Sequence, residues 1–428
     1  MVNILRNRFS DEKMKVFKFG GASVKDVRGV ENVAIILQSF TQTPLLIVVS
    51  AMGKTTNALE KILHQFRHHT DHTAELTSLK HFHATIMSGL FPPAHIVFRM
   101  VNNLFTELES QLRRDGNYDE VYDQVVSFGE LISTVIVHQY LLEKNISCEW
   151  IDARDYVFTD DTFREGKVDW DKTCAAISKL KPDIRKRHFI LTQGFIGRAG
   201  NGLTTTLGRD GSDFSAAIFA SCLEAEAVTI WKDVPGVMNA DPKRLPAATV
   251  FTELPFREAA EMTYYGASVI HPKTIRPLAT RGIPLYVKSF DNPSLPGTVI
   301  HECRVEDLPP LIVFKENQCL ISCKVTDYTF ITEDHLRQVF SVLAELNVRI
   351  NVMQNSAISI SFCIDFDENK LKQLLNRLQA TFEVHYNTGL TLITVKNYGQ
   401  ENFDFYRKQP GVLLEQSSRS TLQVLVRK

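Results

Sequence analysis

The sequence predicts an α/β protein with a mainly parallel sheet sandwiched by helices, followed by a smaller α+β region of ferredoxin-like type. Strand and helix patterns alternate from Met14 to about residue 300, which is typical of parallel sheets with crossover helices. The pair Pro309-Pro310 then marks a boundary. After it, the order strand, helix, strand, strand, helix favours a ferredoxin-like sandwich. At about 150 residues per domain, 428 residues allow two or three domains.

The first region begins with a strand at 16–19, a glycine pair, a helix at 27–40 and an apolar strand at 45–49. Residues 58–145 have mostly helical periodicity, as in 125–142, where apolar residues recur three and four apart. Strand patterns bounded by Gly, Pro or Asp then return at 189–192, 227–231 and 285–287.

The region after the proline pair predicts one complete unit and one shortened unit. The first has strands at 319–325, 350–354 and 357–365 and helices at 333–346 and 370–380. The second keeps strands at 390–395, 412–415 and 421–426 with few helices, as in an approximate internal duplication. The expected domains are a tail at 1–13, an α/β domain at 14–300, a linker at 301–310, and units at 311–386 and 387–428.

Composition indicates an ordinary soluble protein that acts on a small molecule. There are 48 basic and 49 acidic side chains, giving a net charge of −1, whereas nucleic acids and anionic membranes attract an excess of Lys and Arg. No apolar run approaches the roughly 20 residues of a membrane span. The polar N-terminus has no apolar signal core. We therefore expect no nucleic-acid or membrane partner.

The cysteines and histidines predict neither a disulfide framework nor a metal site. None of the seven cysteines forms a CxxC pair, so we expect reduced, mostly buried thiols in a cytoplasmic protein. The 13 histidines show no metal-type spacing, and no resident metal is expected. Two nucleotide-binding motifs are absent from the sequence. The segment Gly53-Lys54-Thr55 resembles the end of a P-loop, but Val48 stands where that motif needs glycine. No predicted strand is followed by GxGxxG and a helix, the pattern of dinucleotide-binding folds.

Two glycine-rich loops are candidates for anion binding. In KFGGASV (18–24) a strand runs into Gly20 and Gly21, whose backbone N–H groups can approach an oxyanion, while Lys18 could neutralise a phosphoryl group. A plain tight turn with a surface lysine explains the same residues. In TTTLGRDGSD (204–213) Arg209 offers a bidentate fork for a carboxylate, although Asp213 alone could be a helix cap.

Other polar residues have both a structural and a functional interpretation. Ser127 and Glu130 fit a capping box, but the Glu130 carboxylate could instead hold a substrate ammonium group. Ser50 and Thr56 could be turn and cap residues of a helix at 58–64. The loop from Trp231 to Lys243 follows a strand, at the sheet edge where ligands of open α/β sheets bind.

Taken together, these segments resemble aspartate kinase, of the amino-acid kinase superfamily. The collinear matches are KFGGASV (18–24), VVSAMG (48–53), SFGE (127–130), QGFIG (193–197), TTTLGRDGSD (204–213), WKDVPG (231–236), AAEM (259–262) and ASVIHP (267–272). The resemblance covers about residues 14–300. It implies an amino-acid-kinase-type sheet and transfer of the γ-phosphoryl group of MgATP to the β-carboxylate of L-aspartate.

The resemblance also implies a role for each matching residue. Lys18, oriented by Asp213, would stabilise the phosphoryl group; Arg209 would bind the substrate α-carboxylate and Glu130 its ammonium group. The remaining implied contacts are Ser50, Thr56 and Ser212 to aspartate, and Gly20, Gly21, Ala22, Lys232, Asp233, Met238 and Lys243 to ATP and its Mg²⁺. Two positions depart from the family pattern: Ser268 replaces a frequent lysine, and Met238 a frequent aromatic residue.

The C-terminal region resembles the paired ACT domains of aspartate kinases, which implies homodimerisation and inhibition by lysine or threonine. The implied effector residues are Met353, Gln354, Asn355 and Ser356. A dimerisation sandwich without a ligand is the alternative. Two other functions stay open: a kinase of the same superfamily with another acceptor, and a non-catalytic amino-acid sensor.

Overall fold

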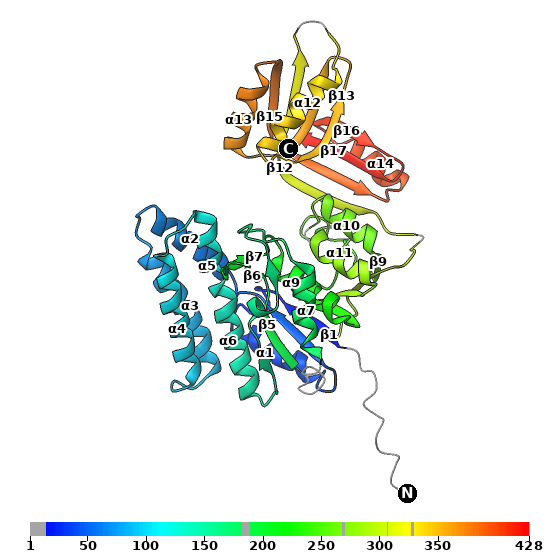
Figure 1. Cartoon of the computed structure of the whole chain (residues 1–428). Coiled ribbons are helices and arrows are strands. Elements are labelled where there is room, and N and C mark those ends of the chain that lie inside the picture. The colour runs from blue at the N-terminus through cyan, green and yellow to red at the C-terminus, as the bar shows by residue number, and fades with distance from the viewer. Residues whose placement is uncertain (1–13, 182–188, 268–269, 306, 327–328, 428) are drawn as a thin grey trace. The chain divides into compact units, whose positions relative to one another are not determined.

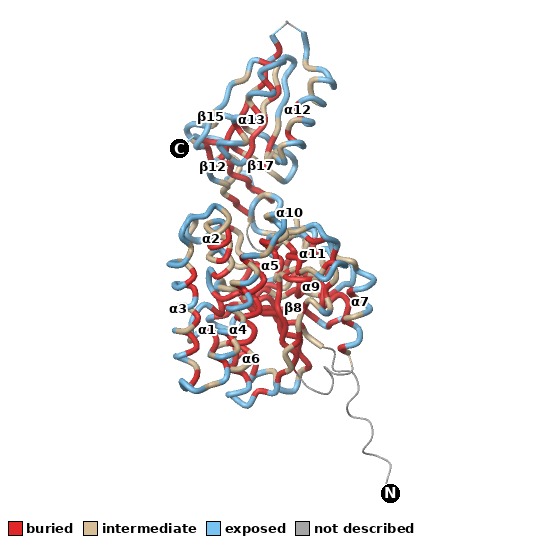
Figure 2. Tube along the Cα trace, turned by 60° about the vertical axis from the view of Figure 1, so that its left-hand side comes forward, coloured by how far each residue is buried: buried red, intermediate tan, exposed pale blue. Residues whose placement is uncertain are grey.

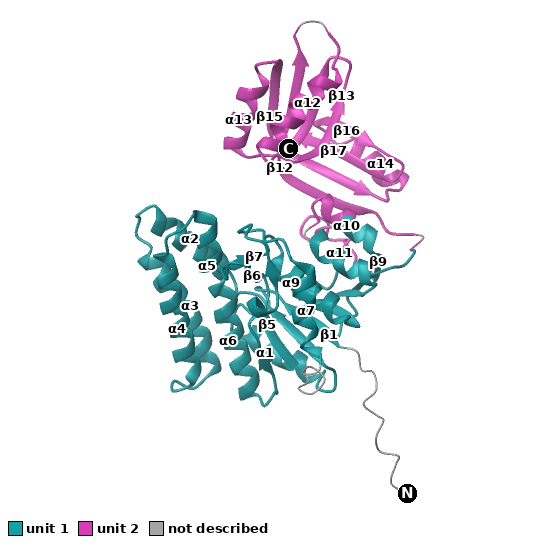
Figure 3. Cartoon of the chain, viewed as in Figure 1, with its two compact units in different colours: residues 1–237, 250–260, 269–304 teal, residues 238–249, 261–268, 305–428 magenta. Residues whose placement is uncertain are grey.

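The computed structural model describes residues 14–181, 189–267, 270–305, 307–326 and 329–427 (Figure 1). The predicted tail at 1–13 and Ser268 lie outside this part of the chain. The chain forms two compact units (Figure 3). The first comprises Met1–Val237, Val250–Ala260 and Val269–Arg304, and the second Met238–Thr249, Glu261–Ser268 and Val305–Lys428. Two short stretches before residue 300 therefore belong to the second unit, whereas the predicted boundary assigned them to the first.

The first unit contains an eight-stranded, mainly parallel sheet, as the sequence predicts. Neighbouring strands are parallel except for the antiparallel pair β10 and β11. In spatial order the strands are β3 (Glu149–Trp150), β5 (Phe189–Gln193), β2 (Leu45–Val49), β1 (Lys15–Phe19), β8 (Ala227–Lys232), β10 (Leu285–Ser289), β11 (Thr298–His301) and β9 (Glu253–Pro255). A small sheet contains β4 (Phe158–Thr159), β6 (Ile196–Ala199) and β7 (Thr204–Thr206).

Helices cover the central strands, which are buried (Figure 2). The helices are α1 (Val27–Gln38), α2 (Thr55–Arg67), α3 (Thr73–Leu90), α4 (Ile96–Leu112), α5 (Tyr118–Val126), α6 (Phe128–Glu143), the short 3₁₀ helix η1 (Ala153–Asp155), α7 (Trp170–Ser178), α9 (Gly211–Leu223), α10 (Phe256–Tyr264) and α11 (Pro272–Arg281). Phe17 and Phe19 of β1 join the hydrophobic cluster that α1 and α6 contribute to. Because strand side chains alternate between faces, Lys18 points to the other face, where α9 contacts β1.

One helical stretch corrects the expectation about membrane-spanning segments. Tyr118–Glu143 is long and apolar enough to cross a membrane by length and composition, with a mean hydropathy of 1.4. The expectation considered only uninterrupted apolar runs, whereas mean hydropathy tolerates scattered polar residues. The apolar window that passes this test within Tyr118–Glu143 is 83% buried in the protein. The helices α5 and α6 pack against α4, as expected of core helices in a globular unit. The predicted single helix at 125–142 is divided at Ser127.

A disulfide corrects the expectation that every cysteine is reduced. Cys174 of α7 is bonded to Cys222 of α9, with their Cα atoms 4.8 Å apart. The two residues are 48 positions apart, so only the packing of the two helices reveals the pair. Cys148, Cys323 and Cys363 are free and buried, and burial raises the pKa of each thiol to about 12.

The second unit contains a six-stranded antiparallel sheet with strand order β13-β14-β12-β15-β17-β16. Its elements are β12 (Leu311–Val325), α12 (Glu333–Glu345), β13 (Ile350–Asn355), β14 (Ser359–Asp365), α13 (Glu368–Leu378), β15 (Phe382–Lys396), α14 (Gln400–Arg407), β16 (Val412–Ser417) and β17 (Thr421–Arg427). The strands β12 and β15 pair along most of their length and serve both halves. The second half looks shortened in the sequence because its first strand is the beginning of β12, where Ile312 packs with Ile393 and Val424.

Candidate active site

A cavity of about 670 Å³ lies where β1 and β2 end and α2 and α9 begin. It brings together many of the residues singled out in the sequence. Its predicted lining residues are Lys18, Gly21, Ser50, Thr56, Glu130, Arg209, Ser212 and Asp213. Residues that sequence reasoning did not select, among them Glu60, Tyr122, Arg164 and Thr206, also line it. This edge of the sheet is the one where α/β proteins bind ligands.

A charge cluster lies at one side of the pocket, where Lys18 and Asp213 line the wall. Lys18 Nζ lies 2.5 Å from Asp213 Oδ1, and Lys232 Nζ lies 3.6 Å from Asp213 Oδ2. Burial raises the pKa of Asp213, but the charges of Lys18 and Lys232 outweigh that effect and hold the pKa below its usual value. Two lysines around one carboxylate leave an excess of positive charge, which suits a phosphate group. Asp213 therefore does more than cap its helix.

The glycine turn after β1 packs closely against the end of β2. A Cβ atom on Gly21 would lie only 2.6 Å from the carbonyl oxygen of Ala51, and one on Gly20 would lie 3.4 Å from Lys18 Nζ. The Gly53 N–H donates to the Gly21 carbonyl oxygen at 2.9 Å. Gly21 thus has no room for a side chain, and Gly20 lies against the ammonium group of the buried Lys18, which lines the cavity. Ala22, the next residue, is exposed.

The start of α9 faces the pocket with its N-terminal residues. Gly208 and Asp210 have positive φ angles of 73° and 54°, which turn the chain sharply into Gly211. A Cβ on Gly194 would lie 2.6 Å from the Cβ of Ser212, so the loop before β6 packs directly on this turn. Backbone N–H groups at a helix N-terminus favour anions. The geometry therefore adds a second anion-binding element beside the lysines.

Glu130 does not form the capping box that its sequence also fitted. The Ser127 hydroxyl donates to the Gln124 carbonyl oxygen instead of capping α6. The Glu130 Oε1 atom accepts a 3.3 Å hydrogen bond from the Ala51 N–H, and its buried Oε2 has no partner among the described residues. Burial raises the pKa of Glu130 to about 8. A cationic ligand would supply the missing partner and stabilise the ionised form.

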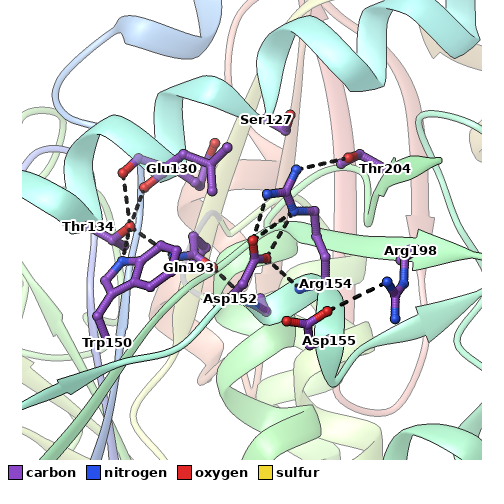
Figure 4. A network of polar contacts seen from close by, with 12 residues as sticks. Ser127, Glu130, Thr134, Trp150, Asp152, Arg154, Asp155, Gln193, Arg198 and Thr204 are labelled. Atoms are coloured by element: carbon purple, nitrogen blue, oxygen red, sulfur yellow. Dashed lines mark hydrogen bonds and ion pairs between the residues drawn. The ribbon is translucent and has the colours of Figure 1, made fainter. Parts of the chain in front are cut away.

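The backbone of α6 at Glu130 is fixed by a buried polar network. The Thr134 hydroxyl donates to the Glu130 carbonyl oxygen at 2.9 Å and accepts from Gln193 Nε2 and Trp150 Nε1 at 3.0 and 3.1 Å (Figure 4). Gln193 Oε1 in turn accepts from the Ala153 N–H at 2.7 Å. The network joins α6, β3, β5 and the turn at η1, so the Glu130 carboxyl is held by rigid elements.

Arg209, Ser50 and Thr56 line the pocket in different ways. The Arg209 side chain is 80% exposed and its Nε lies 3.8 Å from Asp210 Oδ2, so it is free to reach a ligand. The Ser50 carbonyl oxygen accepts from the Ser133 hydroxyl at 2.7 Å. The helix predicted at 58–64 begins earlier, at Thr55, so Thr56 is its second residue and not its cap.

The predicted nucleotide residues divide between the two units. In the first unit, Lys232 belongs to the charge cluster and Asp233 is exposed. Met238 and Lys243 belong to the second unit, where Lys243 is exposed and its N–H donates to Asp241 Oδ1.

Asp123 is the main structural residue that sequence reasoning missed. It is fully buried on α5, and its Oδ2 accepts from the N–H groups of Arg164 and Thr206 at 2.9 and 2.8 Å. Its Oδ1 accepts from the Thr206 hydroxyl at 2.7 Å. Burial raises the pKa of Asp123 to about 6. A charged residue within the apolar stretch 118–143 was the available signal.

The predicted effector residues lie at an edge of the C-terminal sheet. Met353, Gln354 and Asn355 end β13, which pairs only with β14 in the sheet order. Ser356 follows in the turn, where its N–H donates to the Ser359 carbonyl oxygen at 2.8 Å. Gln354, Asn355 and Ser356 are exposed, so this edge is open to a ligand or another chain.

The fold and the pocket define a phosphotransferase of the amino acid kinase class. The family model of the amino acid kinases matches residues 13–289, about two thirds of the chain. The chain belongs to the amino acid kinase family.

Its relatives identify the branch of that family. Lysine-sensitive aspartokinase 3 of Escherichia coli is 32% identical over 394 residues, which cover 89% of this chain and 86% of that protein. Aspartokinase 1 of Arabidopsis thaliana, a chloroplastic protein, is 33% identical over 364 residues, covering 82% of this chain and 63% of that protein. The predicted resemblance to aspartate kinases is confirmed.

Solved structures agree with these relatives. The crystal structure of E. coli aspartokinase III in complex with aspartate and ADP has a TM-score of 0.82 at 28% identity, covering 97% of this chain and 96% of that one. The same enzyme in complex with lysine and aspartate has a TM-score of 0.80. Both parts of the predicted fold class are confirmed, including the C-terminal α+β region.

Proposed function

We propose that this enzyme transfers the γ-phosphoryl group of ATP to the β-carboxylate of L-aspartate, giving 4-phospho-L-aspartate and ADP. This reaction opens the biosynthesis of lysine, threonine and methionine. One observation carries the proposal: the same cavity is lined by the Lys18–Asp213 ion pair, which Lys232 joins from beside Asp213 and which suits a phosphoryl group, and by the buried Glu130 carboxyl, whose Oε2 has no partner among the described residues. An amino acid with a second carboxylate fits this cavity, because its ammonium group can pair with the Glu130 carboxyl while its side-chain carboxylate lies near the phosphoryl group bound at the lysines.

The chemistry needs positioning and charge neutralisation more than a general base. A carboxylate is already ionised and nucleophilic at neutral pH, so one β-carboxylate oxygen attacks the γ-phosphorus while the bond to the ADP oxygen breaks. Lys18 would stabilise the charge on the transferred group, and Asp213 would orient both Lys18 and Lys232 through its two oxygens. The buried ion pairs fix the ammonium groups before substrate arrives.

The acceptor amino acid would be held by groups on several elements. Glu130 would bind the ammonium group through its unpartnered oxygen, and the exposed Arg209 would close on the α-carboxylate. Ser50, Thr56 and Ser212 would complete the aspartate pocket. The nucleotide would lie against Gly20, Gly21, Ala22, Lys232 and Asp233. Met238 and Lys243 remain nucleotide contacts that the resemblance alone implies. Mg²⁺ would arrive on the ATP phosphates, where it supplies charge neutralisation.

Regulation and assembly follow the same proposal. Lysine or threonine would bind at the edge formed by Met353, Gln354, Asn355 and Ser356, and two chains would form a homodimer through the C-terminal region. A charge-balanced chain with its most apolar helices buried supports a cytoplasmic enzyme without nucleic-acid or membrane partners.

An assay with hydroxylamine tests the reaction. Hydroxylamine traps an acyl phosphate as a coloured hydroxamate, so the full chain is incubated with MgATP and each of a panel of amino acids. We expect signal with aspartate and less signal when lysine or threonine is added. Signal only with glutamate or N-acetylglutamate would reassign the acceptor, and no signal with any acceptor would favour a sensor.

A further inference from the structure

Three side chains of metal-ligating type meet at the edge of the large sheet, and none of them lines the active-site cavity. They are Glu253 of β9, His301 at the end of β11, and Cys303 just after it. Their ligand atoms all lie within 4.8 Å of one another, and all three residues are partly buried. We propose that Glu253, His301 and Cys303 form a binding site for Zn²⁺.

The sheet itself brings these residues together. The strands β9 and β11 are parallel, with Glu253 opposite Val299 and Pro255 opposite His301. Side chains two residues apart point to the same face of a strand. Glu253 and His301 therefore project from one face. Cys303 lies two residues beyond the end of β11, and its sulfur reaches the same two side chains. Two elements 48 residues apart in sequence thus present a nitrogen, an oxygen and a sulfur ligand side by side.

The contacts within the group show how a cation would fit. His301 Nε2 lies 2.5 Å from Glu253 Oε1, and the Cys303 thiol also forms a hydrogen bond with the Glu253 carboxylate. One carboxylate is thus shared by two donors. A divalent cation would take the place of the shared hydrogens. The thiol releases its proton to solvent and binds as thiolate, the neutral imidazole carries its one proton on Nδ1 and binds through the Nε2 lone pair, and the carboxylate binds through an oxygen lone pair.

The ligand set selects the metal. Thiolate and imidazole favour Zn²⁺ over Mg²⁺ and Ca²⁺, which prefer oxygen ligands only. Zinc bond lengths of about 2.0 to 2.3 Å place tetrahedral ligands roughly 3.3 to 3.8 Å apart. To bind zinc, His301 Nε2 and Glu253 Oε1 would have to move apart by about 1 Å. The other pairs of ligand atoms, at most 4.8 Å apart, would have to approach by no more than about 1 Å. Three protein ligands leave a fourth position for water.

A metal bound here would stabilise the edge of the large sheet at β9. The strand β9 has only three residues and lies at the sheet edge, where β11 is its one neighbour among the described strands. Ligands from both strands would tie this edge to the rest of the sheet. The proposal does not depend on the phosphoryl-transfer reaction, and its test needs no activity measurement.

Cobalt titration of the full chain tests the site. The protein is freed of metal with a chelator, and one equivalent of Co²⁺ is added. We expect a thiolate-to-cobalt charge-transfer band in the near ultraviolet, intense visible bands of a four-coordinate ion, and loss of both when Zn²⁺ competes, since Zn²⁺ binds such ligands more tightly. Absence of the charge-transfer band in the wild-type protein would overturn the proposal.

Matched variants identify the ligands. Cys303→Ser should abolish the charge-transfer band, and His301→Gln and Glu253→Gln should each weaken Zn²⁺ binding at least about tenfold. Cys148→Ser removes a buried free thiol elsewhere, and His385→Gln removes an exposed histidine paired with Glu383; both should leave the spectrum unchanged. Circular dichroism confirms that each variant is folded. A band that survives Cys303→Ser would show that another cysteine binds the metal.

Discussion

The active-site pocket contains two buried carboxyl groups whose surroundings differ. Asp213 is flanked by Lys18 and Lys232, and its pKa is held below the usual value. Glu130 is just as buried, receives a hydrogen bond from the Ala51 N–H, and has its pKa raised to about 8. Burial acts in the same direction on both groups, so the difference comes from the built-in cations at Asp213.

This contrast separates fixed catalytic machinery from a recognition group. The counter-charges of Asp213 belong to the protein, so its ion pairs are complete before any ligand binds. Glu130 would obtain its counter-charge from the substrate ammonium group. The aspartate-binding side of the pocket is therefore expected to depend on pH and on substrate, whereas the lysine side is preorganised.

The largest effect is expected from Lys18→Ala, which removes one cation from the preorganised side. Turnover of aspartate should fall by about 10³-fold or more, because the phosphoryl charge loses its main partner. Lys232 remains beside Asp213, so the variant should stay folded, which circular dichroism and thermal unfolding can verify. The control is Lys15→Ala on the same strand, whose partly exposed lysine pairs with Glu226. Near-normal phosphorylation by the Lys18 variant would contradict the assignment of this cluster.

Glu130→Gln tests the recognition side. An amide cannot form an ion pair with the substrate ammonium group, so KM for aspartate should rise by about 10- to 100-fold, given roughly 1.5 to 3 kcal/mol for a charged hydrogen bond. Turnover at saturating aspartate should change much less. The measurement is initial rate against aspartate concentration. Glu143→Gln, at the exposed end of the same helix, is the control and should leave KM unchanged.

Although Glu130→Gln should weaken aspartate binding, it should stabilise the folded protein at pH 8. With a folded pKa of about 8 and a usual value near 4.5, Glu130 keeps its proton in the folded state after the unfolded chain has lost it. The folded state then binds more protons, so the free energy of unfolding contributed by this group falls as pH rises from 4.5 to 8. The amide of Glu130→Gln does not titrate, so the variant should not lose this stability. Denaturant unfolding should therefore show a smaller decrease in the free energy of unfolding between pH 5 and pH 8 for the variant than for the wild-type protein.

In the wild-type enzyme, KM for aspartate should itself depend on pH. Only the ionised Glu130 can pair with the ammonium group, so KM should fall by about tenfold per pH unit as pH rises toward 8, and then level. KM for ATP, whose site is on the preorganised side, should change little over the same range. An aspartate KM that is flat between pH 6 and pH 8 would mean that Glu130 does not bind the ammonium group.

The sequence was most informative where chemistry is local to a motif. The strand ending in Lys18 and a glycine pair, and the loop leading to Asp213, could be recognised because glycine, lysine and helix-start patterns lie within ten residues. The alternation of β1 places Lys18 on the face opposite Phe17 and Phe19, and the structure shows α9 on that face. The roles of these residues remain predictions, but they share one pocket because α9 packs on β1 and β2 and brings Asp213 to Lys18.

Features that depend on packing between distant segments could not be predicted. The Cys174–Cys222 bond and the Glu253–His301 contact each join residues 48 positions apart. Glu130 fitted a capping box equally well until the structure showed its side chain at the Ala51 N–H. The second C-terminal half could not be recognised as complete from the sequence, because the long strands β12 and β15 each contribute to both halves of the sheet.

Asp123 provides the smallest and most specific test, because it acts through two lining residues of the pocket. Its carboxylate accepts from the backbone N–H groups of Arg164 and Thr206. Both N–H groups share Oδ2, so in Asp123→Asn an amide oxygen at that position can still accept both, but as a neutral acceptor, and the amide NH2 group replaces Oδ1 beside the Thr206 hydroxyl. Because charge-assisted hydrogen bonds become neutral ones, we expect KM for aspartate to rise by about fivefold, in the range of the net contribution of one hydrogen bond. Asp119→Asn, which alters an exposed ion pair to the same arginine, should have little effect.

The pH profile distinguishes this positioning role from a general loss of stability. Asp123 has a pKa of about 6, so its protonation below pH 6 should disturb the same two hydrogen bonds in the wild-type enzyme. The dependence of KM on pH should therefore be steeper below pH 6, where both carboxyl groups are protonated, than between pH 6 and pH 8, where Asp123 is ionised and Glu130 still binds its proton. Asp123→Asn should remove the extra steepness and keep the dependence due to Glu130. If the variant retains the steeper region, another group titrates there and Asp123 does not position the pocket.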